Sequence, residues 1–481
     1  MVINPLLGQQ LRINDDEMIR KGGAILECAE VFDTGPRKVR DAGWALLFLL
    51  TSALVVYMAM DPMAQQRFAS QEKYMNPLLQ AFLASVVAAL IMQRTAKHYT
   101  TAFVYVALLV APVLAILFGL GMICMSLPLL VKLAGAGLVF GGIIAGSFLL
   151  FCYRELIPFS VLLIQTVMDI ADTHFYMILI PFAGSCLALV WFLLCACAQA
   201  AVYLVHHERI EQFQKDMLST QKVFVFIQLL ILSWGANVIL GTCHVAYCGV
   251  FGRWYYGKDS HPGAFPVLSS TKVACTTSFG SVCFGSLLIS LFQTAAVLAR
   301  MMRDDARQEG NFVLCLIMAI VEAILDCIGD IIEWFSTYAY VQCALRGLGF
   351  LDSVKATYAL CTHQNLSPIL ASSLDSSAVT LGSLMCGLAG GGAAWIAGGR
   401  SWFAVAGLVL GSMVGFNFLL PIKSGVTTLS VCWAEYEEGM RQLRPQLHQE
   451  FCQKLAVAAG QPTVELQAAH GTATAATPVH G

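Results

Sequence analysis

Residues 100–120 read TTAFVYVALLVAPVLAILFGL, a run without a single charged side chain. A helix needs roughly 20 apolar residues to cross a hydrocarbon layer about 30 Å thick, so this stretch is long enough to span a bilayer. Several other segments match or approach it in length and lack of charge: 44–60, 77–93, 133–151, 174–205 and 402–420. The pattern predicts a chain that lies in a membrane as a set of α-helices.

The composition also indicates a membrane protein. Of the 481 residues, 58% are hydrophobic and 12% are charged, against about 25% charged in an ordinary soluble domain. The net charge of −2 and the absence of a basic run give no indication of a nucleic-acid partner. We predict an all-α, polytopic transmembrane helical bundle of about ten spans, with the lipid bilayer as its main partner.

The cysteines and the catalytic motifs indicate no further chemistry. The 17 cysteines are scattered without a CxxC pair, and most fall inside predicted spans. A cysteine in a membrane helix usually packs as a small apolar side chain, so we expect no disulfide, metal site or cofactor. The chain also lacks a P-loop, an HExxH motif and a GxSxG motif, each of which is typical of an enzyme class. No enzymatic activity is predicted.

The flanks of the first apolar run indicate the orientation of the chain. Residues 1–42 carry six basic side chains, whereas the loop at 61–76 carries two. Positive charge is retained on the cytosolic side, so the N-terminal tail 1–42 is predicted to be cytosolic. An even number of spans returns the C-terminus to the same side. A transmembrane domain at 43–440 is thus followed by a cytosolic, partly disordered C-terminal tail at 441–481.

The remaining spans follow from hydropathy. They are predicted at about 43–60, 77–93, 100–121, 131–152, 174–204, 223–252, 272–299, 376–398 and 402–420, with 312–350 as a span broken by charges and glycines. Residues 154–172 differ, because charged residues bracket a moderately apolar stretch, which predicts an amphipathic helix on the cytosolic interface. Gly407, Gly411 and Gly415 form a stripe that predicts close packing against another helix.

Three acidic residues lie within an apolar stretch of the predicted eighth span. Glu322, Asp326 and Asp330 are four residues apart, so they share one face of a helix. A charge in hydrocarbon usually faces a bundle interior or a water path, which would make this face a cation path or a proton-linked acid. The same spacing fits a helix that leaves the membrane and turns an acidic face to water. The sequence leaves both interpretations open.

The predicted sixth span carries polar and aromatic residues suited to a cavity. They are Trp234, Asn237, His244 and Tyr247, of which the first three approach one helical face. Aromatic faces bind a quaternary ammonium group, which has no hydrogen-bond donor on its nitrogen. The alternative is that the histidine is a packed, hydrogen-bonded side chain with no role in binding.

Four blocks in order along the chain indicate a family. Residues 265–302 read FPVLSSTKVACTTSFGSVCFGSLLISLFQTAAVLARMM, in which Gly280-Ser281 and Gly285-Ser286 repeat a small-residue pair. The other blocks are the Trp234 helix with its Trp-Tyr-Tyr end, residues 339–358 and residues 426–440. In these blocks the chain resembles the choline transporter-like family, solute carrier family 44 and its fungal relatives. It departs from the family in a short loop at 61–76.

The resemblance implies transport of choline or a related small organic amine, ethanolamine, by a carrier mechanism. The expected substrate contacts are Trp234, Asn237, His244 and Tyr247, with Ser281 and Ser286 letting the seventh span approach and Glu322 or Asp326 as the counter-charge. The partner is then a small organic cation, and the expected location is the plasma membrane, ahead of an internal membrane. A non-transporting scaffold or receptor-like protein, or an ion channel, is the alternative.

Overall fold

The computed structural model describes residues 18–25, 31–32, 38–60, 72–125, 128–210, 217–259, 265–363 and 367–458. Within these ranges the regular structure is helical and contains no strand, which confirms the predicted all-α class. Most of the predicted N-terminal tail lies outside the described residues. So do positions 61–71 of the predicted outer loop and the part of the predicted C-terminal tail from 459 onward.

Ten helices of the described chain are long and apolar enough to cross a bilayer, which confirms the predicted polytopic bundle. They are α2 (Ala42–Ala59), α4 (Glu72–His98), α5 (Thr100–Cys124), α6 (Leu129–Tyr153), α8 (Leu179–Ile210), α9 (Met217–Tyr255), α11 (Phe279–Gln308), α12 (Phe312–Arg346), α14 (Ser367–Gly398) and α15 (Ser401–Glu435). Shorter elements connect or follow them: α7 (Ile157–Thr173), the 3-10 helix η1 (Phe175–Ile178), α10 (Pro266–Cys275), α13 (Phe350–His363), α16 (Glu437–Leu443) and α17 (Pro445–Ala458).

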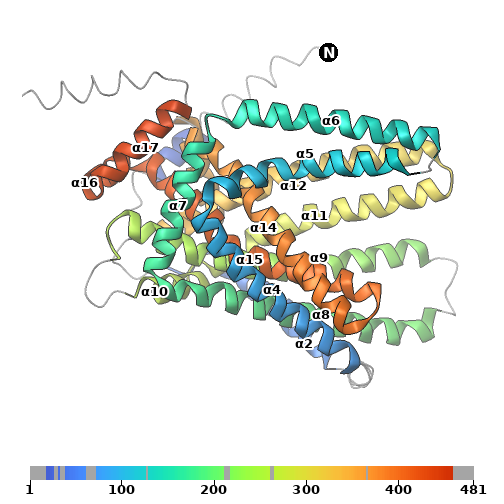
Figure 1. Cartoon of the computed structure of the whole chain (residues 1–481). Helices are drawn as coiled ribbons and strands as arrows, with labels where there is room; N and C mark the ends of the chain where they lie inside the picture. The colour runs from blue at the N-terminus through green and yellow to red at the C-terminus, as the bar shows by residue number, and fades with distance from the viewer. Residues whose placement is uncertain are drawn as a thin grey trace, which may run out of the picture.

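The short helices α7, α10, α16 and α17 gather at one end of the bundle, which we call the capped end (Figure 1). There α7 runs across the ends of the spanning helices. Its side chains Phe159, Leu163, Ile164 and Val167 are almost fully buried. The helix predicted at 154–172 is therefore present, but its apolar face packs into the protein and not into the membrane interface.

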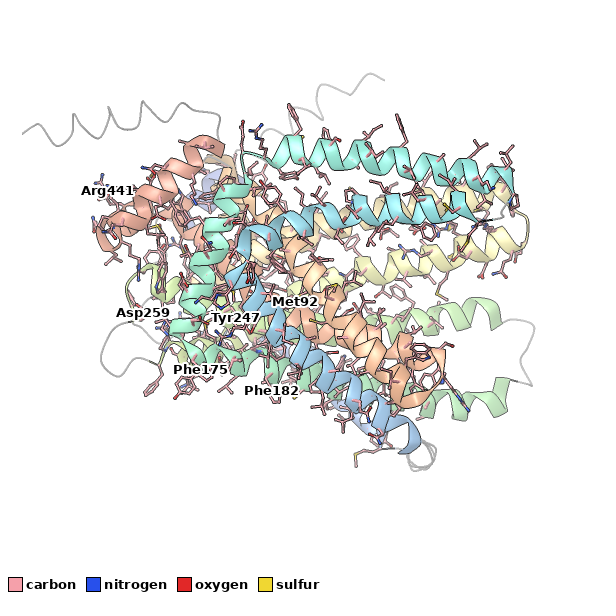
Figure 2. The ribbon with its side chains drawn as sticks, viewed as in Figure 1. Met92, Phe175, Phe182, Tyr247, Asp259 and Arg441 are labelled. Atoms are coloured by element: carbon pink, nitrogen blue, oxygen red, sulfur yellow. The ribbon has the colours of Figure 1, made fainter. Side chains whose placement is uncertain are left out.

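Large apolar side chains cover the outside of the bundle. Phe151 is 85% exposed, and Phe175 and Phe182 are exposed as well, whereas Tyr247 is fully buried (Figure 2). In water, such an exposed apolar surface would make copies of the protein associate. Lipid tails are as apolar as these side chains, so the surface is stable in a bilayer. The exposed apolar surface is the one expected of a multi-pass membrane protein.

Helices α14 and α15 approach each other closely through small residues. A Cβ atom at Gly407 would meet the carbonyl oxygen of Gly390 at 2.6 Å, and one at Gly411 would meet the carbonyl oxygen of Cys386 at 2.7 Å. Small residues let helix backbones approach in lipid, where van der Waals contact drives association. The close packing predicted from the glycine stripe of the last span is confirmed.

Two predicted spans differ in their boundaries. The region at 312–350 was expected to be broken, but α12 is continuous to Arg346 and ends at Gly347, whose φ of 65° forms a left-handed cap. Its charges do not break it, because Glu322 accepts a hydrogen bond from Arg300 of α11. The predicted span at 272–299 is instead two helices, with α11 beginning only at Phe279.

Candidate functional site

Helix α9 packs against α8, α11, α12 and α15, and its two faces differ in character. Asn237 and His244 make hydrogen bonds toward α11, α12 and α15. Val238, Thr242 and Ala246 lie on the other face, which borders a large cavity. One face of α9 is therefore held to its neighbours by hydrogen bonds, and the other face lines the cavity.

His244 joins three helices on the polar face of α9. Its Nδ1 lies 2.7 Å from the hydroxyl of Ser424 on α15, and its Nε2 lies 3.0 Å from the carbonyl oxygen of Thr337 on α12. A carbonyl only accepts, so Nε2 carries a proton, and the second hydrogen bond joins Nδ1 to the Ser424 hydroxyl. The ring is 4% exposed. Both ring nitrogens of His244 are thus hydrogen-bonded in a buried position.

Asn237 belongs to a polar patch between α9 and α11. Its Nδ2 donates to Ser290 Oγ at 2.9 Å and to Gln293 Oε1 at 3.1 Å, and the hydroxyl of Ser233 donates to the same Gln293 oxygen at 3.3 Å. Gln293 is exposed although it lies within a spanning helix. Polar groups inside a span usually face a bundle interior or a water path, and here they bond to one another between α9 and α11.

Ser286 and Tyr247 are both buried within the helix bundle. The Tyr340 hydroxyl lies 3.3 Å from Ser286 Oγ, and a Cβ at Gly285 would meet that hydroxyl at 2.5 Å. Ser286 therefore lies at a close contact between α11 and α12. Tyr247 is fully buried, and among the described residues its hydroxyl has no hydrogen-bond partner.

Trp234 lies in an aromatic cluster that includes rings from α2, α8 and α11. Its indole N–H donates to the carbonyl oxygen of Cys283 at 2.9 Å, and its ring meets Phe48 edge-on with centroids 5.2 Å apart. Phe48 also lies 6.0 Å from Trp191 and 6.0 Å from Phe279. Phe48 therefore connects Trp234 to rings that are distant in the sequence.

Glu322 and Asp326 are not brought together with the α9 residues; both contact arginines of α11. Glu322 accepts from Arg300 Nε at 2.7 Å and from Arg303, and Asp326 lies 3.6 Å from an Arg300 guanidinium nitrogen. Opposite charges on facing helices reduce the desolvation penalty that each would carry alone. The counter-charge role of these carboxylates stays a prediction, and it would require Arg300 to release them.

Ser281 fastens the segment that precedes α2. Its hydroxyl donates to Asp41 Oδ2 at 2.7 Å, and the same oxygen accepts from the backbone N–H of Phe350 at 2.9 Å. A carboxylate at the first N–H of a helix is a favourable cap. A Cβ at Gly280 would meet the carbonyl oxygen of Arg40 at 2.4 Å, so only a bare backbone fits there. Asp41 thereby joins α2, α11 and α13 at the capped end.

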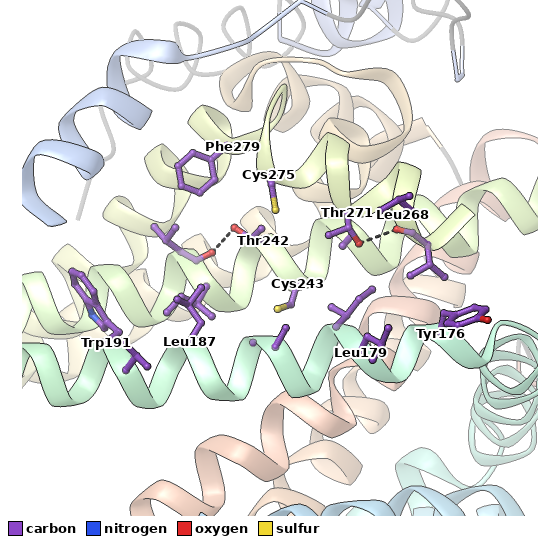
Figure 3. Close-up of a pocket in the computed structure, with 18 of the residues that line it drawn as sticks. Tyr176, Leu179, Leu187, Trp191, Thr242, Cys243, Leu268, Thr271, Cys275 and Phe279 are labelled. Carbon is purple, nitrogen blue, oxygen red and sulfur yellow. Dashed lines mark hydrogen bonds between the residues drawn. The ribbon is translucent and has the colours of Figure 1, made fainter. Parts of the chain in front are cut away.

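A cavity of about 1160 Å³ lies on the apolar face of α9, between α2, α8 and α10 (Figure 3). Its lining runs from Tyr176 of η1 to Leu194 of α8, which is about 27 Å at 1.5 Å per residue. The hydroxyls of Thr242 and Thr271 donate to carbonyl oxygens within their own helices. Pockets for drug-sized ligands measure roughly 300–1,000 Å³, so a small molecule fits here with room to move.

Aromatic side chains from α2, η1, α8, α11 and the residue before α10 line this cavity: Phe48, Phe175, Tyr176, Trp191, Phe265 and Phe279. Phe175, Tyr176 and Phe265 are exposed and lie at its open rim. The indole N–H of Trp191 donates to the carbonyl oxygen of Leu232 at 3.1 Å, which fixes the ring in place. No Asp, Glu, Lys or Arg of the described chain belongs to the lining. A cation in this cavity would be held by ring faces and hydroxyl oxygens.

None of the eight predicted site residues lines the cavity, although Trp234 contacts Phe48 behind its wall. Sequence reasoning missed Phe48, Trp191 and Phe279, because an aromatic residue in an apolar run is as often lipid-facing as cavity-facing. One signal exists in retrospect: Trp191 is a lone tryptophan in the middle of its span. The tertiary structure is needed to see what it faces.

The polar face of α9 is closed at the capped end by a buried ion pair. Arg346 and Glu435 lie 3.1 Å apart with side chains 8% and 5% exposed, and Gln342 donates to the second Glu435 oxygen. The Tyr255 hydroxyl donates to the carbonyl oxygen of Tyr436 at 2.9 Å. These contacts tie the ends of α9, α12 and α15 together.

Burial also changes the pKa of two groups outside the spans at this end. It raises the pKa of Tyr256 well above its ordinary value, and the neutral ring stacks on Tyr436 with centroids 6.2 Å apart. Burial lowers the pKa of Arg444, whose guanidinium carbon lies 3.7 Å from the Trp254 ring centroid. The ring face compensates part of the desolvation of that cation.

Comparisons with known proteins agree on one family. A family model described as plasma-membrane choline transporter matches residues 136–438. A CTL-like protein of Dictyostelium discoideum is 29% identical over 62% of this chain and 52% of that protein. Protein PNS1 of Yarrowia lipolytica is 25% identical over 78% of this chain and 69% of its own, and PNS1 of Eremothecium gossypii is 28% identical over 61% and 54%. The chain thus spans about half the length of two of these relatives.

Proposed function

This chain belongs to the plasma-membrane choline transporter family, and from that premise we propose that it carries choline or a related small amine, ethanolamine, across a membrane. The family indicates a transporter in general, and ten spanning helices make the chain a multi-pass membrane protein. We place it in the plasma membrane, with the capped end facing the cytosol, because basic residues gather before the first span.

The observation that supports an organic cation is the ring-lined cavity beside α9. A quaternary ammonium spreads its charge over methyl groups, so it is attracted by aromatic faces, each worth roughly 0.5–2 kcal/mol. The ring centroid of Phe48 lies 6.0 Å from the ring centroids of both Trp191 and Phe279. A methylated nitrogen beside Phe48 would therefore be within reach of three rings, and the choline hydroxyl could bond to Thr242, whose oxygen can still accept.

The contacts of α9 also support a carrier mechanism. On its polar face α9 is held to α12 and α15 by directional hydrogen bonds through His244. Across the cavity it faces α2 and α8 mainly through apolar side chains, so that movement there would have to break the hydrogen bond from Trp191 to the Leu232 carbonyl oxygen and few other directional contacts. We place the moving surfaces of an alternating-access cycle across the cavity, between α9 on one side and α2 and α8 on the other.

Uptake of labelled choline into proteoliposomes tests the proposal. Saturable uptake is expected, and Trp191→Ala should raise the KM by about 5- to 30-fold, the equivalent of roughly 1–2 kcal/mol. Trp191→Phe keeps a ring face and should retain most of the affinity. Trp395→Ala is the matched control, because Trp395 is 58% exposed on the outside of α14.

Two further results would separate the alternatives. Absence of uptake for choline, ethanolamine and other small amines would contradict the proposal, and stable cytosolic partners without flux would then favour a scaffold. Amine currents that do not saturate would favour a channel. Saturable uptake that Trp191→Ala leaves unchanged would keep the transporter and remove the cavity as its substrate site.

A further inference from the structure

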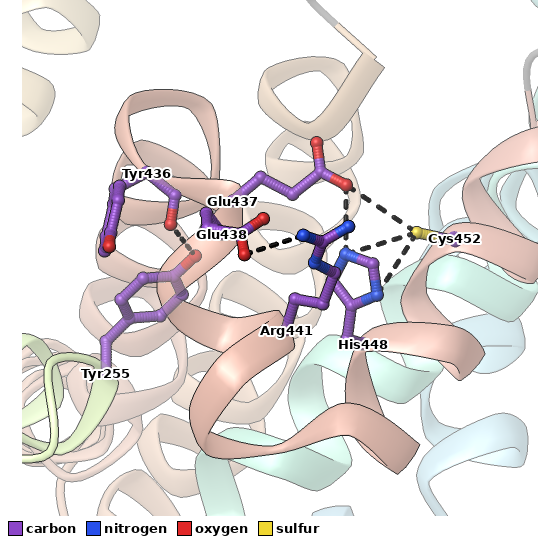
Figure 4. A network of polar contacts seen from close by, with 7 residues as sticks. All are labelled: Tyr255, Tyr436, Glu437, Glu438, Arg441, His448 and Cys452. Atoms are coloured by element: carbon purple, nitrogen blue, oxygen red, sulfur yellow. Dashed lines mark hydrogen bonds and ion pairs between the residues drawn. The ribbon is translucent and has the colours of Figure 1, made fainter. Parts of the chain in front are cut away.

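A cluster of three potential metal ligands lies at the capped end, outside the spanning helices. Glu437 begins α16, and His448 and Cys452 are four residues apart on α17, so both project from the same face of that helix. Figure 4 shows the three side chains converging on one another. One ligand atom from each lies within 4.8 Å of the other two.

The distances between the ligand atoms fit a tetrahedral ion. His448 Nε2 lies 3.0 Å from Glu437 Oε1, and Cys452 Sγ lies 3.7 Å from the same nitrogen and 3.8 Å from the same oxygen. Bonds of about 2.3 Å to sulfur and 2.0–2.1 Å to nitrogen and oxygen, at tetrahedral angles, place such ligands about 3.3–3.6 Å apart. Cys452 Sγ also lies 3.9 Å from His448 Nδ1, so a rotation of the Cys452 or His448 side chain is needed to bring the sulfur to the Nε2 side of the ring.

The surroundings of the cluster also suit an ion. His448 is 4% exposed and its ring stacks on Trp433 at 5.2 Å, which holds the imidazole in orientation. Arg441, the cation beside the cluster, is paired with Glu438 at 2.8 Å. Glu437 is 55% exposed, so a water molecule can reach the fourth position.

We propose that Glu437, His448 and Cys452 form a Zn²⁺ site that fastens α16 to α17. Sulfur, imidazole and carboxylate donors in one tetrahedral set favour Zn²⁺ over Mg²⁺ and Ca²⁺, which prefer oxygen ligands and higher coordination numbers. Glu437 is two residues from Glu435, the partner of Arg346. Bound Zn²⁺ therefore stabilises the closed arrangement of the capped end. The proposal does not depend on the identity of the transported molecule.

Metal binding to the full chain in detergent tests the site directly. Co²⁺ should bind with one ion per chain and give the visible bands of a tetrahedral site together with a thiolate charge-transfer band, and Zn²⁺ should displace it. Cys452→Ser should abolish the charge-transfer band and weaken Zn²⁺ binding at least 100-fold, and Glu437→Gln should weaken it at least tenfold. Cys361→Ser and Glu450→Gln are the matched controls, and binding should be unchanged in both.

Alkylation of the unmodified protein provides a second measurement that needs no variant. Zn²⁺ should slow iodoacetamide labelling of Cys452 at least tenfold while leaving Cys361 unaffected, and Mg²⁺ should have no effect. Equal labelling of Cys452 with and without Zn²⁺ would overturn the proposal. So would Co²⁺ binding that lacks the thiolate band or persists in Cys452→Ser.

Discussion

The indole of Trp191 occupies the space that a side chain at position 235 would need: a Cβ atom on Gly235 would meet Cε2 of Trp191 at 2.0 Å. Gly235 therefore lets α9 receive the ring of α8 against its bare backbone. This contact sets the position of Trp191 at the wall of the large cavity. The proposed binding surface therefore depends on the absence of a side chain at position 235 as well as on the ring.

Gly235→Val should disturb the cavity without removing an aromatic residue. Overpacking at a close contact costs about 1–3 kcal/mol, and here it must displace Trp191 or part α8 from α9. We expect a lower thermal midpoint in detergent and a raised KM for choline uptake. Gly137→Ala serves as the control, because no atom lies within 4 Å of a Cβ built there. A variant with normal midpoint and uptake would show that the contact is unimportant.

His244→Leu should destabilise the bundle more than His244→Gln. Leucine leaves the Ser424 hydroxyl and the Thr337 carbonyl without their partner in a buried position, and an unsatisfied buried polar group costs about 1–3 kcal/mol. Glutamine can both donate and accept, so it should recover part of that loss. Thermal unfolding of both variants measures the difference. If the two variants unfold at the same temperature, the hydrogen bonds do not stabilise the junction.

Asp41→Ala should loosen the junction of α2, α11 and α13. It removes the acceptor of the Ser281 hydroxyl and of the Phe350 N–H, and loss of a capping carboxylate costs about 0.5–2 kcal/mol. Hydrogen exchange at the start of α13 should become faster. Asp352→Ala is the control on the same helix, since the ion pair that Asp352 makes with Lys355 is exposed and such pairs contribute little. Unchanged exchange in Asp41→Ala would contradict the capping role.

Glu435→Gln should lower stability strongly, because it removes a carboxylate that lies 3.1 Å from the buried Arg346 guanidinium. Breaking one partner of a buried pair typically costs about 3–5 kcal/mol. A double variant, Arg346→Met with Glu435→Leu, removes both charges and should recover much of the loss. Thermal midpoints measured in detergent compare the three proteins. A single variant as stable as the unmodified protein would show that the pair does not hold the capped end closed.

Glu438→Gln is the matched control for this pair. The neighbouring Arg441 side chain holds the pKa of Glu438 below its usual value. The stabilisation from this pair is complete above the usual pKa of a glutamate, and it is lost as the pH falls through the lowered pKa. Both partners are exposed, at 59% and 41%. Solvent screens such pairs, and the midpoint at neutral pH should barely change.

Much of the fold was predictable, because the bilayer imposes a length and an apolar composition on every span. Runs such as 100–120 meet that requirement in isolation, without reference to any neighbour. The errors in the predicted helix boundaries arose where contacts with neighbouring helices decide whether a helix continues. The charges of α12 do not interrupt the helix because Arg300 of α11 lies opposite Glu322, and no local pattern reveals that pairing.

The candidate site was predictable only in part. Helical spacing placed Asn237 and His244 near one face of α9, and both do make polar contacts to neighbouring helices. Trp234 points instead into the cluster around Phe48. Hydropathy cannot distinguish an aromatic ring that faces lipid from one that faces a cavity, since both environments favour the same side chains.

The sequence by itself determined that this protein lies in a membrane, that it is helical, where its spans approximately lie and to which family it belongs. These properties depend on local composition and on short motifs in a fixed order. Only the tertiary structure decided which rings share a cavity, which charges meet and which ligands converge. Phe48, Trp191 and Phe279 are far apart in the chain. Glu437, His448 and Cys452 come together only because α17 folds back against α16.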